Sequence, residues 1–216
     1  MPDNQPTLEF AEFEVKFRVA GDSVYAFKAL AEKLPGLLQF IYLESDDLYY
    51  VKEGDEFLRH RFDKKNLAGR QELTYKKKMK SANNIYRKEN NMRCDDNSIE
   101  GVADFCENLG FKWNFKISKY VHIYKFEDAT LPFYTVIDEA GNMDHFMEIE
   151  VDEEKLKGMT EDQAWEVIQK YEKLLAPLGI TPQKRLRKSL FEMYRKDVKS
   201  DKDQSARPDP SQVQSS

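Results

Sequence analysis

The feature that most constrains this chain is a strict alternation of charged and apolar residues near its N-terminus. From Glu12 to Val19 the sequence reads Glu-Phe-Glu-Val-Lys-Phe-Arg-Val. Successive side chains of a β-strand point to opposite faces of the sheet, so one face of this segment is charged and the other is apolar. This is also the ordinary pattern of an antiparallel strand with one face in water. The segment therefore predicts a strand and leaves open where its charged face points.

The same alternation recurs along the chain, which favours an enclosed charged face. The recurring charged pairs are Arg59 and Arg61, Lys76 and Lys78, Arg87 and Glu89, and Glu148 and Glu150. A sheet of about eight strands can close into a barrel, and one face of every strand then lines the interior. Closure also removes exposed sheet edges. We therefore expect the charged faces to line an interior and helices to cover the apolar exterior.

Electrostatics then predicts a ligand in this interior. Two carboxylates on alternate positions of a strand lie about 7 Å apart. At an effective dielectric constant near 20, their repulsion is roughly 2 kcal/mol per pair. Two Glu-x-Glu pairs in one interior favour a divalent cation between them, and oxygen ligands suit Mg²⁺ or Mn²⁺. Clustered Lys and Arg residues call for a polyanion, so the combination indicates a nucleotide or polyphosphate.

Hydrophobic spacing and turn residues predict an α+β chain. The expected strands are 8–19, 37–51, 56–64, 70–80, 84–94, 111–126, 131–139 and 144–152. Hairpin turns are expected at 52–55, 81–84 and 139–142, which contain Gly or Asn. Helices are expected at 23–34 after an Asp22-Ser23 cap, at 98–109, and at 160–179, where Thr160 and Gln163 form a capping-box pattern. A fourth helix is expected after Thr181-Pro182, with an apolar stripe of Leu186, Leu190 and Met193.

Composition bounds the organisation and excludes several functions. We expect one domain over residues 1–199 and a disordered tail at 200–216, because the tail has almost no apolar residues to bury.

The net charge of −5 argues against a nucleic-acid partner. No apolar run approaches the roughly 18 residues of a membrane span, and the N-terminus resembles no secretory leader, so we expect a cytoplasmic protein. No P-loop, GxGxxG, HExxH or paired-cysteine motif is present.

The ordered set of charged residues resembles the CYTH superfamily, the triphosphate tunnel metalloenzymes. This family includes class IV adenylyl cyclases, thiamine triphosphatases and inorganic tripolyphosphatases. The resemblance covers residues 8–194, including the stretch at 186–192, which looks like the family's C-terminal helix. The residues that carry it are Glu12, Glu14, Lys16, Arg59, Arg61, Lys76, Lys78, Arg87, Lys119, Asp138, Glu148 and Glu150.

The resemblance implies a closed eight-stranded antiparallel β-barrel, or tunnel, with helices packed outside. It implies Mg²⁺ or Mn²⁺ held by Glu12, Glu14, Glu148 and Glu150, with Asp138 assisting. It also implies that the phosphates contact Lys16, Arg59, Arg61, Lys76, Lys78, Arg87 and Lys119. Catalysis would depend on Glu12, Glu14, Lys16 and Lys119. Asp138 also has a simpler interpretation, since it precedes a turn and can cap it.

One departure from the family pattern lies in the strand that contains Lys119. The family often has Lys-x-Arg there, whereas this chain has Val121 at the second position. Lys125 lies on the same face and is a substitute candidate. Lys116 and His122 are expected on the opposite face, as structural or surface residues.

The expected function is metal-dependent hydrolysis of a nucleoside, thiamine or inorganic triphosphate. A class IV adenylyl cyclase, which converts ATP to cyclic AMP and pyrophosphate, uses the same site and remains an alternative. A non-catalytic module that binds nucleotide or polyphosphate is the second alternative. The sequence does not choose among them, because no residue visibly recognises adenine.

Overall fold

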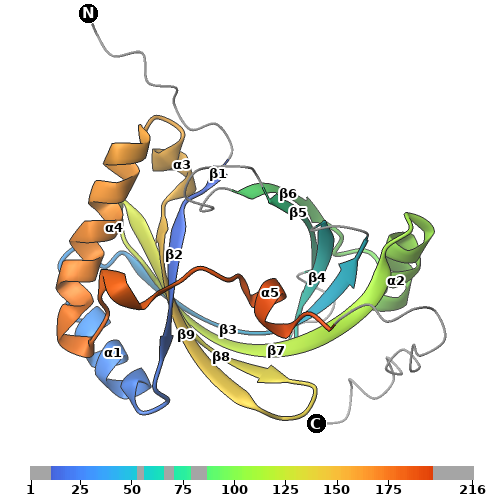
Figure 1. Ribbon diagram of the computed structural model, residues 1–216, viewed down its shortest axis with the longest axis horizontal. Coiled ribbons are helices and arrows are strands. Elements are labelled where there is room, and N and C mark those ends of the chain that lie inside the picture. The colour runs from blue at the N-terminus through green and yellow to red at the C-terminus, as the bar shows by residue number, and fades with distance from the viewer. Residues whose placement is uncertain (1–10, 53–55, 66–70, 79–86, 197–216) are drawn as a thin grey trace, which may run out of the picture.

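A computed structural model describes residues 11–52, 56–65, 71–78 and 87–196 of the chain. Within these ranges the strands form one antiparallel sheet with helices on its outer face and one short helix, Leu190–Tyr194, at its inner space (Figure 1), which confirms the α+β class. The sheet curves strongly around a central space, as Figure 1 shows. The strand order is β1-β6-β5-β4-β3-β7-β8-β9-β2-β10.

The observed elements follow the predicted ones closely in the sheet. The strands are β1 (Ala11–Glu12), β2 (Glu14–Val19), β3 (Gln39–Val51), β4 (Phe57–Asp63), β5 (Gln71–Lys78), β6 (Arg87–Arg93), β7 (Lys112–Lys125), β8 (Ala129–Asp138), β9 (Met143–Val151) and β10 (Arg185–Leu186). The helices are α1 (Ser23–Ala31), α2 (Ile99–Asn108), α3 (Glu153–Leu156), α4 (Glu161–Leu175) and α5 (Leu190–Tyr194). Each of the eight predicted strands is confirmed, and the first is divided at Phe13 into β1 and β2.

The first strand changes partner where it is divided. Its first two residues pair with β6, with Glu12 opposite Arg87. The residues after Phe13 pair with β9, with Glu14 opposite Glu150. One continuous segment therefore supplies a strand at one end of the sheet order and a strand close to the other end. Hydrogen bonds among the described residues do not close the sheet, so the expected closed barrel is not confirmed.

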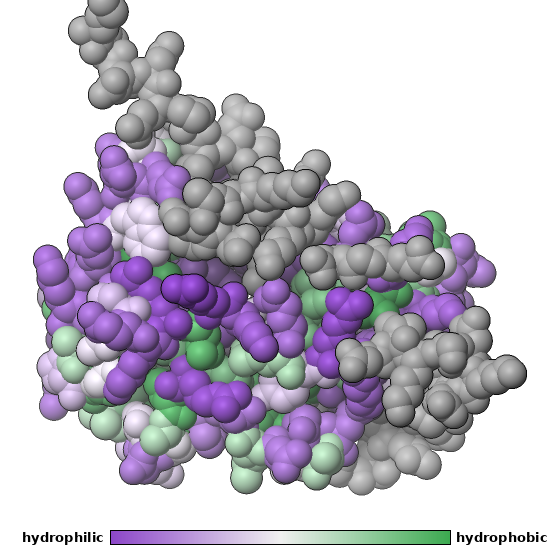
Figure 2. All heavy atoms as spheres, in the orientation of Figure 1, coloured by the Kyte–Doolittle hydropathy of each residue, from purple (hydrophilic) through white to green (hydrophobic). Residues whose placement is uncertain are grey.

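The apolar faces of the strands lie on the outside, under helices, as the alternation predicts. Phe13, between β1 and β2, and Phe17 of β2 are fully buried in a cluster with Ile168 of α4. On the other flank, Leu58 of β4 packs in a second cluster with Val102 of α2. Beyond these covered flanks the surface is highly charged, and hydrophilic residues dominate the face drawn in Figure 2. None of the described helices is long and apolar enough to cross a membrane.

The C-terminal part of the chain differs from its prediction. The expected helix after Thr181-Pro182 is only a single 3₁₀ turn, and Leu186 belongs to the short strand β10, opposite Lys16 of β2. A helix begins only after Ser189, whose hydroxyl accepts the backbone N–H of Glu192 in a capping box. Pairing with the free edge of β2 therefore overrides the helical spacing of the apolar residues.

Some of the predicted helix caps and turns are present in the structure and others are not. The capping box of Thr160 and Gln163 is present at α4, whereas the Asp22 side chain makes no capping bond at α1. The turn at 139–142 is confirmed, with Gly141 at φ +82°. The turns expected at 52–55 and 81–84 lie wholly or partly outside the described residues, and so does the expected tail at 200–216.

A buried histidine gives a prediction about stability. The ring of His60 in β4 is fully buried, and its Nε2 lies 2.9 Å from the side-chain oxygen of Gln71. Burial lowers the pKa of His60 below its ordinary value of 6.5. The folded state therefore favours the neutral ring, and this stabilisation is present above pH 6.5 and is lost as the pH falls toward and through the lowered pKa. We expect the melting temperature to fall less between about pH 7.5 and about pH 5.5 in His60→Gln than in the wild type. Thermal unfolding at the two pH values tests this, and equal losses in both proteins would contradict it.

Candidate functional site: a cavity between an acidic and a basic wall

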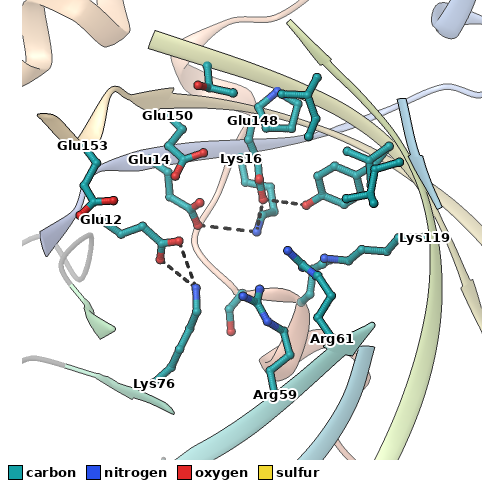
Figure 3. Close-up of a pocket in the computed structure, with 18 of the residues that line it drawn as sticks. Glu12, Glu14, Lys16, Arg59, Arg61, Lys76, Lys119, Glu148, Glu150 and Glu153 are labelled. Atoms are coloured by element: carbon teal, nitrogen blue, oxygen red, sulfur yellow. Dashed lines mark hydrogen bonds and ion pairs between the residues drawn. The ribbon is translucent and has the colours of Figure 1, made fainter. Parts of the chain in front are cut away.

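The inner face of the curved sheet encloses a cavity of about 510 Å³. The sequence-predicted residues that line it are Glu12, Glu14, Lys16, Arg59, Arg61, Lys76, Lys119, Glu148 and Glu150. Figure 3 shows the carboxylates on one side of the cavity and three cations on the opposite side. We call Glu12, Glu14, Glu148 and Glu150 the acidic wall, and Arg59, Arg61 and Lys119 the basic wall. Charged faces of separate strands therefore meet in one cavity.

The acidic wall is formed by β2 and β9, which pair in register. Lys16 lies opposite Glu148 in the sheet, and its Nζ is 2.5 Å from that carboxylate and 3.7 Å from Glu14. The hydroxyl of Tyr134 donates a 2.7 Å hydrogen bond to the same oxygen of Glu148. Glu153 of α3 also lines the cavity and lies beside Glu150 and Glu12 in Figure 3. The four-residue helix that carries Glu153 was not predicted.

Crowding of these carboxylates shows in their pKa values. Burial, together with the charge of Glu148, raises the pKa of Glu14 to about 7. Burial and three neighbouring glutamates raise the pKa of Glu150 well above its ordinary value. Burial alone would also raise the pKa of Glu148, but Lys16 holds it below its ordinary value. Burial and mutual repulsion therefore both oppose the ionisation of Glu14 and Glu150.

Glu12 and Lys76 connect the acidic wall to the other edge of the sheet. The ammonium of Lys76 lies 2.9 Å from the Glu12 carboxylate. Glu12 belongs to β1 and Lys76 to β5, with β6 between them in the sheet. Lys76 is the first residue of the basic stretch 76–80, and its side chain is largely buried instead of solvated.

The basic wall is organised by a carboxylate that the sequence analysis missed. Asp47 of β3 is fully buried and lies opposite Arg61 in the sheet. Its two oxygens accept hydrogen bonds from Nε and Nη2 of Arg61, at 2.7 and 2.9 Å. The ammonium of Lys119 lies 3.1 Å from the same carboxylate. Asp47 therefore fixes two cations of the cavity at once.

The pKa values of this cluster reflect its burial and its charges. Burial opposes ionisation of Asp47, yet Arg61 and Lys119 hold its pKa well below the ordinary value. Burial lowers the pKa of Lys119 to about 7, with Asp47 acting in the opposite direction. Next to this cluster, Arg59 donates a 3.0 Å hydrogen bond to the hydroxyl of Thr74. Its guanidinium thereby also has a fixed position.

One end of the inner space is filled by the C-terminal helix. Phe191 of α5 stacks on Phe57, with ring centroids 4.1 Å apart, and Tyr49 stacks on Phe115 at 4.4 Å. The hydroxyl of Tyr194 donates a 2.6 Å hydrogen bond to Asp144 of β9. Aromatic packing thus bounds the cavity on the α5 side, beyond Arg59.

The donor chemistry of the acidic wall fits a divalent cation. Among the described residues, no three acidic, histidine or cysteine side chains stand ready to coordinate one ion. Lys16 and Lys76 are instead within ion-pair distance of Glu14, Glu148 and Glu12. Carboxylate oxygens are nevertheless the ligands that Mg²⁺ and Mn²⁺ prefer. Burial and, after it, repulsion from neighbouring glutamates raise the pKa values of Glu14 and Glu150, and a bound cation would relieve the repulsion.

Comparisons with known proteins assign the fold. No family model matches the chain, and no curated protein matches its sequence. A solved structure of a protein from Pyrococcus horikoshii OT3 is 26% identical over 86% of this chain and 99% of its own, with a TM-score of 0.66. A candidate adenylate cyclase from Bacillus halodurans is 14% identical over 85% and 96% of the two chains, with a TM-score of 0.55. The Mimivirus capping enzyme triphosphatase is 9% identical over 78% and 91%, with a TM-score of 0.51.

The chain shares the fold of these solved structures, in agreement with the resemblance of its sequence to the CYTH superfamily. A chain of the Schizosaccharomyces pombe Mediator head module is also similar, at 12% identity over 77% and 95% of the two chains and a TM-score of 0.59. The fold alone therefore does not assign an activity.

Four further residues were predicted at the site. Asp138 is not among the residues that line the cavity; its carboxylate accepts hydrogen bonds from the backbone N–H groups of Ala140 and Asn142 and caps the β8–β9 turn. The structure therefore does not bring Asp138 to the glutamates. The side chains of Lys78 and Arg87 lie outside what the structure describes. Lys125 lines the cavity, as expected of the substitute candidate.

The residues predicted on the opposite face of β7 are found there. Lys116 lies 2.7 Å from the buried carboxylate of Asp46, and neither residue lines the cavity. The ring of His122 stacks on Phe40, on the outer surface of the sheet. Both are structural or surface residues, as the alternation indicates.

Proposed function

We propose that this chain is a divalent-metal-dependent triphosphate phosphohydrolase whose sheet closes into a tunnel around its substrate. The observation that carries the proposal is one cavity in which an acidic wall faces a basic wall. A carboxylate wall alone suits a cation and a basic wall alone suits an anion. Together they suit an anion that arrives with its metal.

The basic wall supplies what phosphoryl transfer needs from a protein. Such transfer depends mainly on positioning and on stabilising the charge that develops on phosphate oxygens. Lys119 is buried and Arg59 and Arg61 are partly buried, and all three are held by ion pairs, so little reorganisation is needed when the charge develops. Lys16 and Lys76, which now neutralise glutamates, are placed to contact the phosphates from the other side.

The acidic wall would hold the metal. Glu12, Glu14, Glu148 and Glu150 are the candidate ligands, with Mg²⁺ or Mn²⁺ as the candidate ions. A bound ion would polarise phosphate oxygens and offset the charge of the glutamates. Occupancy by the ion would also release Lys16 and Lys76 to contact the phosphates.

The reaction is tested by its products. Purified protein is incubated with ATP, tripolyphosphate or thiamine triphosphate, in the presence of Mg²⁺ or Mn²⁺. We expect release of inorganic phosphate and loss of this release after chelation of the metal. Cyclic AMP with pyrophosphate as the main products would instead establish the cyclase alternative. Tight triphosphate binding without turnover under either metal would establish a binding module.

A further inference from the structure

Apolar side chains form a continuous patch next to the basic wall. Leu43, Val121, Ile123 and Pro132 line the same cavity as the charged residues. Leu43 lies directly opposite Val121 in the β3–β7 pair, and Ile123 lies directly opposite Pro132 in the β7–β8 pair. Directly opposed residues on one face of a sheet contact each other. We refer to these four residues as the apolar wall.

The position of the apolar wall relative to the cations is fixed by β7. Lys119, Val121, Ile123 and Lys125 follow one another on the inner face of this strand, at steps of about 7 Å. In the other direction from Lys119, the space is filled by the aromatic stack of Phe191 and Phe57. A ligand whose phosphates contact Lys119 therefore has room to extend along β7 toward Lys125.

A bare phosphate chain gains nothing from this surface. Apolar side chains cannot hydrogen-bond phosphate oxygens. A phosphate group buried against them would lose its solvation without compensation. Burying an apolar group of the ligand there is favourable in proportion to its area. The cavity of about 510 Å³ also lies in the size range of pockets that enclose drug-sized organic ligands.

From this placement, we infer that the apolar wall is a subsite for an uncharged organic group attached to the triphosphate. The inference rests on the proposed function and names its substrate class as organic triphosphates in preference to inorganic tripolyphosphate. The four residues of the wall offer only hydrocarbon, so the group is held through its face and not through its hydrogen-bonding edge. Different nucleobases should therefore be accepted about equally.

Substrate comparison tests the inference with the full chain. We measure kcat/KM for ATP, CTP and tripolyphosphate with Mg²⁺, and binding of the same three compounds by calorimetry. We expect ATP and CTP to exceed tripolyphosphate by at least about tenfold, and to differ from each other by less than about fivefold. Preference for tripolyphosphate, or strong discrimination between ATP and CTP, would overturn the inference.

Two substitutions in the wall and one outside it sharpen the test. Val121→Arg places a second cation beside Lys119, and Ile123→Thr replaces hydrocarbon with a hydroxyl. We expect each to lower the ATP-to-tripolyphosphate ratio, Val121→Arg by at least about tenfold. Val19→Thr, on the outer face of β2, should leave the ratio unchanged. Circular dichroism confirms that each variant is folded, and unchanged ratios in both folded wall variants would overturn the inference.

The outcomes separate this inference from the proposed function. Turnover of triphosphates with tripolyphosphate preferred would overturn the subsite and leave the phosphohydrolase standing. Preferred binding of ATP and CTP without phosphate release would support the subsite and overturn the phosphohydrolase. Absence of binding of all three compounds would overturn both.

Discussion

Replacing Asp47 with alanine is expected to lower the free energy of unfolding by about 3 kcal/mol, because it leaves the buried Lys119 and the partly buried Arg61 without their partner. Asp47 is fully buried and binds both Arg61 and Lys119. Loss of this anchor should also lower kcat/KM for a triphosphate by about a hundredfold, since small displacements of binding groups have effects of that size. Urea unfolding and steady-state kinetics measure the two effects.

Two comparison variants make this result interpretable. Asp47→Asn keeps the shape of the side chain and removes its charge, so it should retain the fold better than alanine while still losing activity. Asp96→Ala removes an exposed carboxylate for which the structure gives no bond, and should change the free energy of unfolding by less than about 0.5 kcal/mol. If Asp47→Asn kept wild-type stability and kinetics, Asp47 would not organise the basic wall.

Glu14→Ala and Glu148→Ala should each abolish metal-dependent turnover while leaving the protein folded. Each removes one candidate ligand from the acidic wall, and we expect losses of more than about a hundredfold, because changes to groups behind a ligand already cost about 10- to 100-fold. Phosphate release at saturating Mg²⁺ measures the loss, and circular dichroism verifies the fold.

The matched control for these variants is Glu166→Ala. Glu166 is exposed on α4, outside the cavity, so its removal should leave turnover unchanged. Unchanged activity in both Glu14→Ala and Glu148→Ala would show that the metal site is misassigned. Loss in only one of them would restrict the ligand set to that glutamate and its neighbours.

The strands and the meeting of their charged faces could be predicted because the period of two is a local property. Each alternating segment specifies which side chains share a face, and repeated charged faces need a common enclosure. Arg59 and Arg61 were assigned to the cavity on this basis, and Lys119 was assigned by the family resemblance; all three line the cavity. Helix α3 could not be predicted in this way, because four residues are too few to show a helical period.

The alternation shows which face of a strand a side chain lies on, but not how far along the strand it lies. This explains the main differences between the predicted and the observed site. Asp138 has the same parity as the cavity residues Thr130 and Tyr134 but lies at the far end of β8, where the turn binds it. The adjacent Asp46 and Asp47 must face opposite sides of β3, and sequence does not show which partners each meets. Their signal was nonetheless present, since two carboxylates in the middle of a buried strand require cationic partners.

The division of the first strand at Phe13 has a consequence for affinity. Glu12 and Glu14 lie on either side of the residue where the strand exchanges β6 for β9. A metal ion bound by both carboxylates, as proposed above, would therefore bridge the β1–β6 pair and the β2–β9 pair. If the proposed ion binds both carboxylates, its binding and the two strand pairings would be linked equilibria, so a substitution that weakens either pairing would weaken binding even where no candidate ligand has changed.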